Sequence, residues 1–566
     1  MKRIFFPVIF AIFFFTVYLP AQTSRPEFNR KQTFDVQHYK IETSFDRAKH
    51  EIYGTTTITL KPLAANFGSF ELDAVGLSFK KVKVEPSGTD LKFRTSTDKI
   101  FITLDKAYGP DDIIAVTLTY SAKPKKGVYF VDPQIDSGKE VRSAQIYSQG
   151  EADENRHWFP SFDFPSDKAT TEQIITAEKD FTVIANGELL SKKENANGTV
   201  TWHYKMPVPH SSYLVSFVIG KYAKVEDKYK DIPLGYYVYP GREATARKAY
   251  ANTPAMIRIY EELTGVAFPY NKYDQTVVAA FNFGGMENIT ATTMADTEIF
   301  AVEIPFLAGN IEDLVSHELA HSWFGDLVTC RNWAELWLNE GFATFMEAAY
   351  REKMYDRKDY MRMIADDAEG FITEDAVLPN NHALFNQQAG NVAALFDHSG
   401  VTYSKGGAVI HTLREQVGDA AFWKAINIYL NRHKFASVET QDLQNAMEET
   451  SGQDLGWFFA QWVYGTGFPK LTVAPVWNAA KKTLTITVTQ TQKTGGANTA
   501  AYKLPMKVNF DFGPLGKQFE VDSIRDVGIA KRSEVFTFKL PRKPIKVELD
   551  KENRIPIKSV KVLPIR

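Results

Sequence analysis

A chain of 566 residues is too long for a single hydrophobic core and predicts about three domains. It has the composition of an ordinary globular protein, with 44% hydrophobic and 24% charged residues and a net charge of -2. No long basic run is present, so the electrostatic surface that nucleic-acid binding requires is not expected. Cys330 is the only cysteine, which excludes an intramolecular disulfide and cysteine-rich zinc sites.

The N-terminus has the pattern of a secretory signal. Lys2 and Arg3 precede an apolar run from Ile4 to Leu19, and small residues suited to cleavage follow. The alternative is a membrane anchor, but the run is interrupted by Pro7 and is shorter than the ~20 residues that span a bilayer. We therefore expect a removable signal over residues 1–21. The exported protein would be periplasmic or extracellular, with no stable membrane insertion after signal removal.

Three regions of different pattern follow along the chain. From Phe34 to Val218, runs such as Thr55–Leu60 are rich in β-branched residues and separated by turn sequences, which predicts an antiparallel β-domain without evident helix. Apolar residues then recur with helical spacing, as in Asn339–Met354, and strand alternation returns in Leu484–Gln490. The fold is predicted to be multidomain α+β. Its segments are a signal peptide (1–21), an N-terminal β-domain (22–221), a helix-rich domain (222–466) and a C-terminal β-domain (467–566).

The stretch NIEDLVSHELAHSWFG (Asn310–Gly325) contains two histidines four residues apart. On a helix, His317 and His321 share one face and can hold one metal ion with imidazole nitrogens at about 2 Å. Glu318 lies about 100° around the helix from His317, where it can act as the base for a metal-activated water. We expect Asn310 to cap this helix and Gly325 to end it. The alternative is a pair of ordinary polar residues on a helix.

A third ligand would decide between these interpretations, because a tetrahedral catalytic zinc site has three protein ligands and keeps the fourth position for water. Glu340 is a candidate, since it lies at the start of the next predicted helix. Glu347 is two turns further along the same helix face, where its carboxylate can accept the free ring proton of a ligand histidine. The alternative for Glu347 is a solvated helix glutamate.

HELAH, followed after eighteen residues by NEG with Glu340, resembles the gluzincin peptidases of the alanyl aminopeptidase (M1) family. Upstream, the family's GGMEN-type signature matches five consecutive residues: Gly284, Gly285, Met286, Glu287 and Asn288. The resemblance implies an N-terminal β-sandwich or saddle domain, a thermolysin-like catalytic domain with one Zn2+ ion, and a small C-terminal β-sandwich. The large helical C-terminal domain of most members has no counterpart in this sequence, so a short form is expected.

The resemblance also implies roles for residues that no spacing rule selects. Glu287 occupies the family's position for recognising the substrate's free amine, and Gln149 and Glu151 match a second pair that faces the substrate. Tyr403, in TYSKGG, corresponds to the tyrosine that stabilises the oxyanion opposite zinc. Phe283 corresponds to a wall of the first side-chain pocket. The alternatives are surface polar residues for Gln149 and Glu151, a packing tyrosine and a core phenylalanine.

These residues together predict a secreted zinc metallo-aminopeptidase that acts on peptides with a free N-terminus. Glu318 would be the general base and Tyr403 the oxyanion stabiliser, while His317, His321 and Glu340 would bind zinc. The alternatives are a zinc endopeptidase and a non-catalytic peptide-binding member of the family. Neither the preferred N-terminal residue nor the oligomeric state follows from the sequence.

Overall fold

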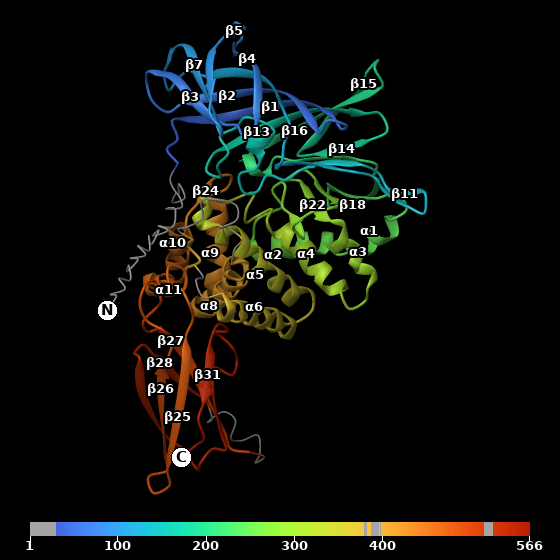
Figure 1. Cartoon of the computed structure of the whole chain (residues 1–566). Helices are drawn as coiled ribbons and strands as arrows, with labels where there is room; N and C mark the ends of the chain where they lie inside the picture. The colour runs from blue at the N-terminus through green and yellow to red at the C-terminus, as the bar shows by residue number, and fades with distance from the viewer. Residues whose placement is uncertain (1–29, 379–381, 387–395, 397, 514–523) are drawn as a thin grey trace, which may run out of the picture.

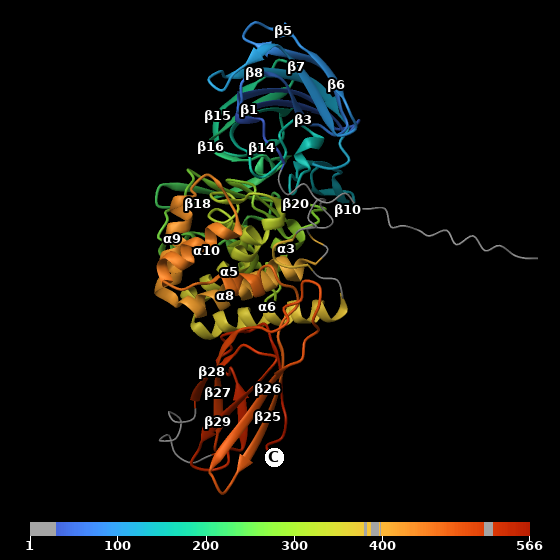
Figure 2. The ribbon, with the colours of Figure 1, turned by 90° about the vertical axis from the view of Figure 1, so that its left-hand side faces the viewer.

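The computed structural model describes residues 30–378, 382–386, 396, 398–513 and 524–566, so the predicted signal peptide (1–21) lies outside the described residues. The described chain forms three parts stacked along one long axis (Figure 1). A β-rich part comes first, a part with both sheet and helices lies in the centre, and a second β-rich part follows, an order that the turned view also shows (Figure 2). Within the described residues, no helix combines the length and apolarity that a membrane span needs.

The N-terminal part is built on an eight-stranded sheet. In spatial order its strands are β15 (Glu188–Glu194), β16 (Thr199–Ser211), β13 (Lys168–Glu178), β1 (Phe34–Asp46), β2 (Glu51–Pro62), β8 (Ile114–Ala122), β4 (Leu77–Glu85) and β5 (Thr89–Asp90). Alternate residues of β2, β8 and β13 are buried, as expected for a sheet with one face on a core. One pair corrects the prediction of a purely antiparallel domain: β1 and β13 are parallel. A parallel pair needs a long crossover, and the chain between these two strands supplies one.

Two smaller sheets complete this part. One has the order β3 (Phe67–Asp73), β7 (Lys99–Tyr108) and β6 (Lys92–Thr95), and the other has the order β14 (Thr182–Ala185), β17 (Phe217–Gly220), β12 (Gln145–Ser148) and β9 (Val128–Val131). The remaining elements are the hairpin of β10 (Gln134–Asp136) and β11 (Lys139–Arg142) and the 3-10 turns η1 (Asn155–His157) and η2 (Ser212–Leu214). Strand β12 reaches the central part, where the Tyr147 hydroxyl donates to the Ala280 carbonyl at 3.0 Å.

The central part begins with a five-stranded sheet. Its spatial order is β18 (Ala223–Tyr229), β19 (Ile232–Val238), β20 (Tyr273–Val278), β22 (Ala291–Ala295) and β21 (Gly285–Met286). The middle strands β19, β20 and β22 are parallel, and the short strand β21 runs antiparallel at the edge. Helices precede β20 and follow β22: α1 (Glu243–Ala249), α2 (Thr253–Thr264), α3 (Asp296–Phe300) and the 3-10 turn η3 (Ala301–Glu303).

Helix α5 (Trp337–Met354) lies at the centre of the helical layer and contacts its neighbours on several sides. Most of its residues are buried, because a helix enclosed by other helices has no solvent face. Its neighbours include α2, α4 (Ala308–Ala320), α6 (Arg357–Val377) and α8 (Gly406–Val417), and side chains of α9 (Asp419–Arg432) and α10 (Thr440–Ser451) also reach it. Helix α11 (Gly456–Trp462) ends the helical layer along the chain. Short elements join them: β23 (Thr329–Cys330), β24 (Ser437–Val438), the 3-10 turn η4 (Trp333–Glu335) and the π-helical turn η5 (Val401–Lys405).

The C-terminal part is a sandwich of two sheets. The first has the order β29 (Ser533–Lys539), β26 (Thr483–Gln490), β25 (Lys470–Asn478) and β31 (Ser559–Val562), and the second has the order β28 (Ile524–Ile529), β27 (Leu504–Asp511) and β30 (Lys546–Leu549). Phe510 and Phe538 join the sheets with ring centroids 5.1 Å apart. The expected multidomain α+β fold, β-rich at both ends and helical between, is confirmed. The predicted boundaries at 221/222 and 466/467 fall in connections between these parts.

Candidate active site

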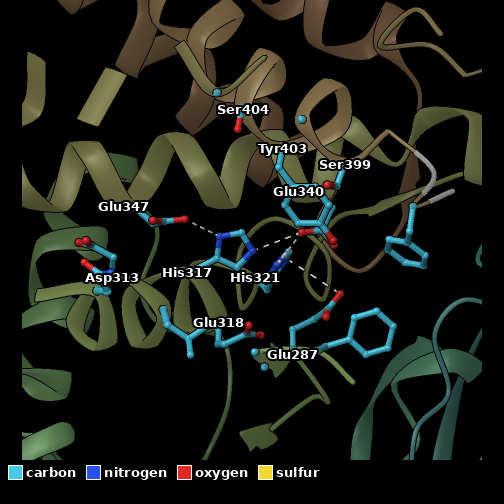
Figure 3. A pocket seen from close by; sticks show the side chains of 18 of the residues that line it. Glu287, Asp313, His317, Glu318, His321, Glu340, Glu347, Ser399, Tyr403 and Ser404 are labelled. Carbon is cyan, nitrogen blue, oxygen red and sulfur yellow. Dashed lines mark hydrogen bonds and ion pairs between the residues drawn. The ribbon is translucent and has the colours of Figure 1, made fainter. Parts of the chain in front are cut away.

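A pocket of about 800 Å³ opens in the central part beside its boundary with the N-terminal part. The residues that line it are Glu151, Phe283, Gly284, Gly285, Glu287, Asn310, Asp313, Leu314, His317, Glu318, His321, Glu340, Glu347, Gly370, Glu374, Phe396, Ser399, Gly400, Tyr403 and Ser404. Many carboxylates and two histidines face this space (Figure 3), and no lysine or arginine lines it among the residues that the structure describes. The pocket is therefore built to receive cations.

Helix α4 presents His317 to the pocket, and His321, the first residue after the helix, faces the same space. Ile311, Val315 and Leu319 recur every fourth residue on its buried face, which anchors the helix to the core. The expected helix ends are wrong, because α4 begins at Ala308 and ends at Ala320 rather than spanning the interval between Asn310 and Gly325. At the start, the Leu307 carbonyl already accepts the N–H of Ile311 at 3.2 Å, so the first turn forms before Asn310 and without a capping side chain.

His317, His321 and Glu340 bring three ligand atoms around one point. Oε2 of Glu340 lies 3.3 Å from Nε2 of His317 and 3.4 Å from Nε2 of His321. Ligand atoms placed tetrahedrally at about 2 Å from a zinc ion lie about 3.3 Å from one another. The side chains of His321 and Glu340 are almost completely buried, that of His317 is 12% exposed, and the three form one of the groups of possible metal ligands in this pocket. The donor set and its spacing therefore fit zinc.

The other ring nitrogen of each histidine has its own acceptor. Nδ1 of His317 lies 2.7 Å from Oε1 of Glu347, and Nδ1 of His321 lies 2.9 Å from the Phe324 carbonyl. Each acceptor fixes the tautomer in which Nδ1 carries the proton and Nε2 is free to bind a metal. Glu347 thus lies against the side of the His317 ring that faces away from Glu340.

Glu318 lines the pocket and is buried next to the edge strand β21. A Cβ added at Gly285 would lie 2.2 Å from Oε1 of Glu318, so only glycine allows the strand to approach this carboxylate so closely. Burial raises the pKa of the Glu318 carboxyl to about 8. A cation held by His317 and His321 would lower that pKa again, which leaves a carboxylate able to take a proton.

Tyr403 lies on the other side of the histidines, in the π-helical turn η5 (Figure 3). Its ring is nearly parallel to that of His317, with centroids 6.0 Å apart and an interplanar angle of 19°. Gly341 and Gly406 let α5 and the chain after Tyr403 meet, since a Cβ at Gly341 would lie 3.0 Å from the Gly406 Cα. Burial and the surrounding carboxylates raise the pKa of Tyr403 well above its ordinary value, so its hydroxyl remains a donor.

Two further carboxylates, Glu151 and Glu287, lie at one end of the pocket. Both are buried, and each has an oxygen within 4.8 Å of the other's and of a Glu340 oxygen. Oε1 of Glu151 is buried and has no hydrogen-bond partner among the described residues. Burial raises the pKa of both carboxyls, and the charge of Glu287 raises that of Glu151 further. A cationic group placed between the two carboxylates would pair with the free oxygen of Glu151 and offset the cost of burying two like charges.

The structure places the remaining predicted residues in two groups. Phe283, Gly284 and Gly285 line the pocket. Gln149, Met286 and Asn288 do not line it, and all three are buried. Met286 lies behind the wall because successive residues of a strand face opposite sides, and its sulfur accepts from Gln149 Nε2 at 3.1 Å. Asn288 donates to Thr293 Oγ1 at 3.0 Å. These three residues support the wall instead of facing the space.

Several lining residues were not predicted. Asp313 and Leu314 precede His317 by four and three residues, so helical spacing alone could have placed them on the pocket side of α4. Gly370 and Glu374 come from α6, and Ser404 adjoins Tyr403. No local pattern distinguishes these last residues from ordinary helix positions.

Comparison with known proteins matches both parts of the chain that form this pocket. The family model described as "Peptidase M1 N-terminal domain" matches residues 35–214, and the one described as "Peptidase family M1 domain" matches residues 248–462. The chain is 34% identical to "Aminopeptidase N" of Streptomyces lividans over 348 residues, 60% of this chain and 39% of the relative.

Two archaeal relatives match over a longer stretch. "Probable aminopeptidase 2" of Sulfurisphaera tokodaii is 29% identical over 440 residues, 77% of this chain and 54% of its own. "Tricorn protease-interacting factor F2" of Thermoplasma acidophilum is 27% identical over 456 residues, 79% of this chain and 55% of its own. The chain thus spans about half the length of these relatives. Since the two family models together cover the β-rich part and the helical part around the pocket, this chain belongs to peptidase family M1.

Proposed function

We propose that this protein is a zinc aminopeptidase that removes the N-terminal residue from peptides. One observation carries the proposal: the buried carboxylates Glu151 and Glu287 lie beside the cluster of His317, His321 and Glu340. The cluster suits a metal, and the carboxylate pair suits an ammonium group. An ammonium held at a fixed place next to the metal ligands sets which peptide bond reaches the reacting centre. The names of the aminopeptidase relatives support the same activity.

The residues of the pocket divide the reaction between them. His317, His321 and Glu340 would hold the zinc ion, which when bound polarises the scissile carbonyl and lowers the pKa of a water molecule. Glu318 takes the proton of the attacking water and passes it to the leaving nitrogen. The Tyr403 hydroxyl donates to the carbonyl oxygen as negative charge develops on it. Glu151 and Glu287 bind the free amine and so hold the first peptide bond of the substrate at the reacting centre.

The sequence leaves two other functions open, an endopeptidase and a non-catalytic peptide-binding protein. The buried pair of Glu151 and Glu287 favours cleavage at the amino end, because a chain continuing past this point would bury both carboxylates without a cation. A binding protein would need neither Glu318 nor Tyr403 in the pocket. We therefore place the aminopeptidase first.

A panel of aminoacyl chromogenic substrates tests the proposal. Each substrate is offered with a free and with an acetylated amine, before and after treatment with a chelator. We expect hydrolysis of the free-amine substrates only, loss of activity with chelator, restoration by zinc, and a fall of at least about 100-fold for Glu318→Gln. Activity that survives the chelator or Glu318→Gln would reject the zinc mechanism, and equal cleavage of acetylated substrates would reject the exopeptidase assignment.

We also propose that the protein is exported, on the pattern of residues 1–21. Expression of the full chain in a bacterial host, followed by fractionation and N-terminal sequencing, checks this. The expected result is a mature protein outside the cytoplasm that begins near residue 22. Retention in the cytoplasm with residues 1–21 still attached would contradict it.

A further inference from the structure

Tyr213 is a buried tyrosine from the N-terminal part whose hydroxyl reaches the candidate active site. It lies in η2, and its ring meets Trp333 edge-on with centroids 5.2 Å apart. The turn is held rigidly, because Asn155 Nδ2 donates to the carbonyls of Ser212 at 2.6 Å and Val215 at 3.0 Å. The hydroxyl lies 3.3 Å from Oε1 of Glu287.

A chain of hydrogen bonds sets the direction of the Tyr213 hydroxyl. The backbone N–H of Cys330 donates to Oδ1 of Asn339 at 3.0 Å, so the amide group of Asn339 must turn Nδ2 towards Tyr213. Nδ2 of Asn339 lies 3.3 Å from the Tyr213 oxygen and can only donate to it. The hydroxyl oxygen is therefore an acceptor for Asn339, and its own proton must point elsewhere.

Two acceptors lie within reach of that proton, Oε1 of Glu287 at 3.3 Å and the Gly325 carbonyl at 3.5 Å. The Gly325 carbonyl already accepts from the Thr329 hydroxyl, whereas Glu287 is a buried carboxylate. A charged acceptor forms the stronger bond, so the proton goes to Glu287. The bonds then run in one direction from Cys330 through Asn339 and Tyr213 to Glu287.

We propose that Tyr213 is a positioning residue, which holds the Glu287 carboxylate in the orientation that receives the substrate's ammonium group. Asn339 directly precedes Glu340, so the same chain of bonds ties the amine-binding carboxylate to the start of the helix that carries a metal ligand. Tyr213 thereby fixes the separation between amine recognition and the metal. The proposal rests on the proposed aminopeptidase function, and it adds a residue of the N-terminal part to that machinery.

Tyr213→Phe tests the proposal because it removes only the hydroxyl. We expect KM for free-amine aminoacyl substrates to rise about tenfold, since a hydrogen bond to a charged group is lost, while kcat, zinc affinity and the melting temperature stay close to wild type. In a Glu287→Gln background the same change should alter KM less than twofold, because the carboxylate that Tyr213 orients is already absent. Tyr250→Phe is the matched control, because its buried hydroxyl has no partner among the described residues.

Three outcomes would overturn the proposal. The first is an unchanged KM in Tyr213→Phe, and the second is an equal rise of KM with and without Glu287. The third is a loss of zinc affinity as large as the loss of substrate affinity, or a clear fall in melting temperature, either of which would mean that Tyr213 acts on the fold as a whole. Failure of the proposed function is separate and appears in the wild type. In that case the zinc-loaded wild type would bind leucinamide and N-acetyl-leucinamide equally in a calorimetric titration, and the role of Tyr213 in amine recognition would be rejected with it.

Discussion

Removal of the Glu347 carboxylate should weaken zinc binding by a calculable amount. Its Oε1 accepts the Nδ1 proton of His317 at 2.7 Å, and its side chain is 16% exposed. A hydrogen bond to a charged partner contributes roughly 1.5–3 kcal/mol, and the partial exposure places this one at about 2 kcal/mol. At 1.4 kcal/mol per tenfold, Glu347→Ala should raise the zinc dissociation constant about 30-fold. Glu347→Gln keeps an acceptor without the charge, so about fivefold is expected.

Zinc affinity is measured by competition with a metallochromic chelator at constant pH, which does not depend on catalytic activity. Glu298→Ala, in an exposed glutamate of α3, is the control and should bind zinc like the wild type. If Glu347→Ala binds zinc within twofold of the wild type, or if Glu347→Gln is weakened as much as Glu347→Ala, the carboxylate does not hold His317 as the structure indicates.

Three further predictions concern the site and its support. Gly285→Ala pushes a methyl group into Glu318 and should lower kcat at least about 100-fold with zinc affinity unchanged, whereas Gly68→Ala, with open space around it, should be neutral in the same assays. Burial lowers the pKa of His210 to about 4, so its ring is neutral in the folded protein, while the unfolded chain binds a proton below about pH 6.5. The contribution of His210 to the free energy of unfolding is present above pH 6.5 and is lost as the pH falls towards 4, by about 1.4 kcal/mol per pH unit. In urea unfolding, His210→Gln should lack this part of the pH dependence. Arg351→Gln breaks an ion pair with Asp313 and a hydrogen bond to the Gly309 carbonyl, which together tie α5 to α4. It should cost roughly 2–3 kcal/mol, which a melting temperature equal to wild type would contradict.

The metal cluster could be predicted from the sequence because its spacing is local. Helical periodicity alone predicts that His317 and His321 lie on one face, and they do so although α4 ends one residue before His321. Glu340 lies in the first turn of α5. The same local reasoning gave the wrong start for α4, at Asn310 instead of Ala308. The start of a helix depends on which backbone carbonyls of the preceding turn are free to accept hydrogen bonds. Tyr403 needed the family resemblance, because a lone tyrosine carries no periodic signal.

Apart from Glu151, which the family resemblance assigned to the substrate site, contacts between the N-terminal and central parts could not be predicted. Tyr213 lies 74 residues from Glu287 and 126 from Asn339, and its hydrogen bonds exist only because the N-terminal part packs on the central part. Only the position of Asn339, directly before Glu340 in the sequence, indicated that it lies near the site. Met286 shows a second limit of sequence-based prediction. The GGMEN motif is recognised as a whole, but successive strand residues face opposite sides, so only some of its residues line the pocket.

The divided origin of the pocket has a consequence for how such an enzyme can change. Glu151 and Tyr213 come from the β-rich part, whereas Glu287, Glu318 and the three residues proposed to bind zinc come from the central part. In the proposed function, amine recognition thus depends on both parts, through Glu151 and Glu287, whereas bond cleavage depends on the central part alone. If that proposal holds, substitutions around Glu151 change which peptides are accepted without touching the residues assigned to water activation, so specificity and catalysis can evolve at different rates.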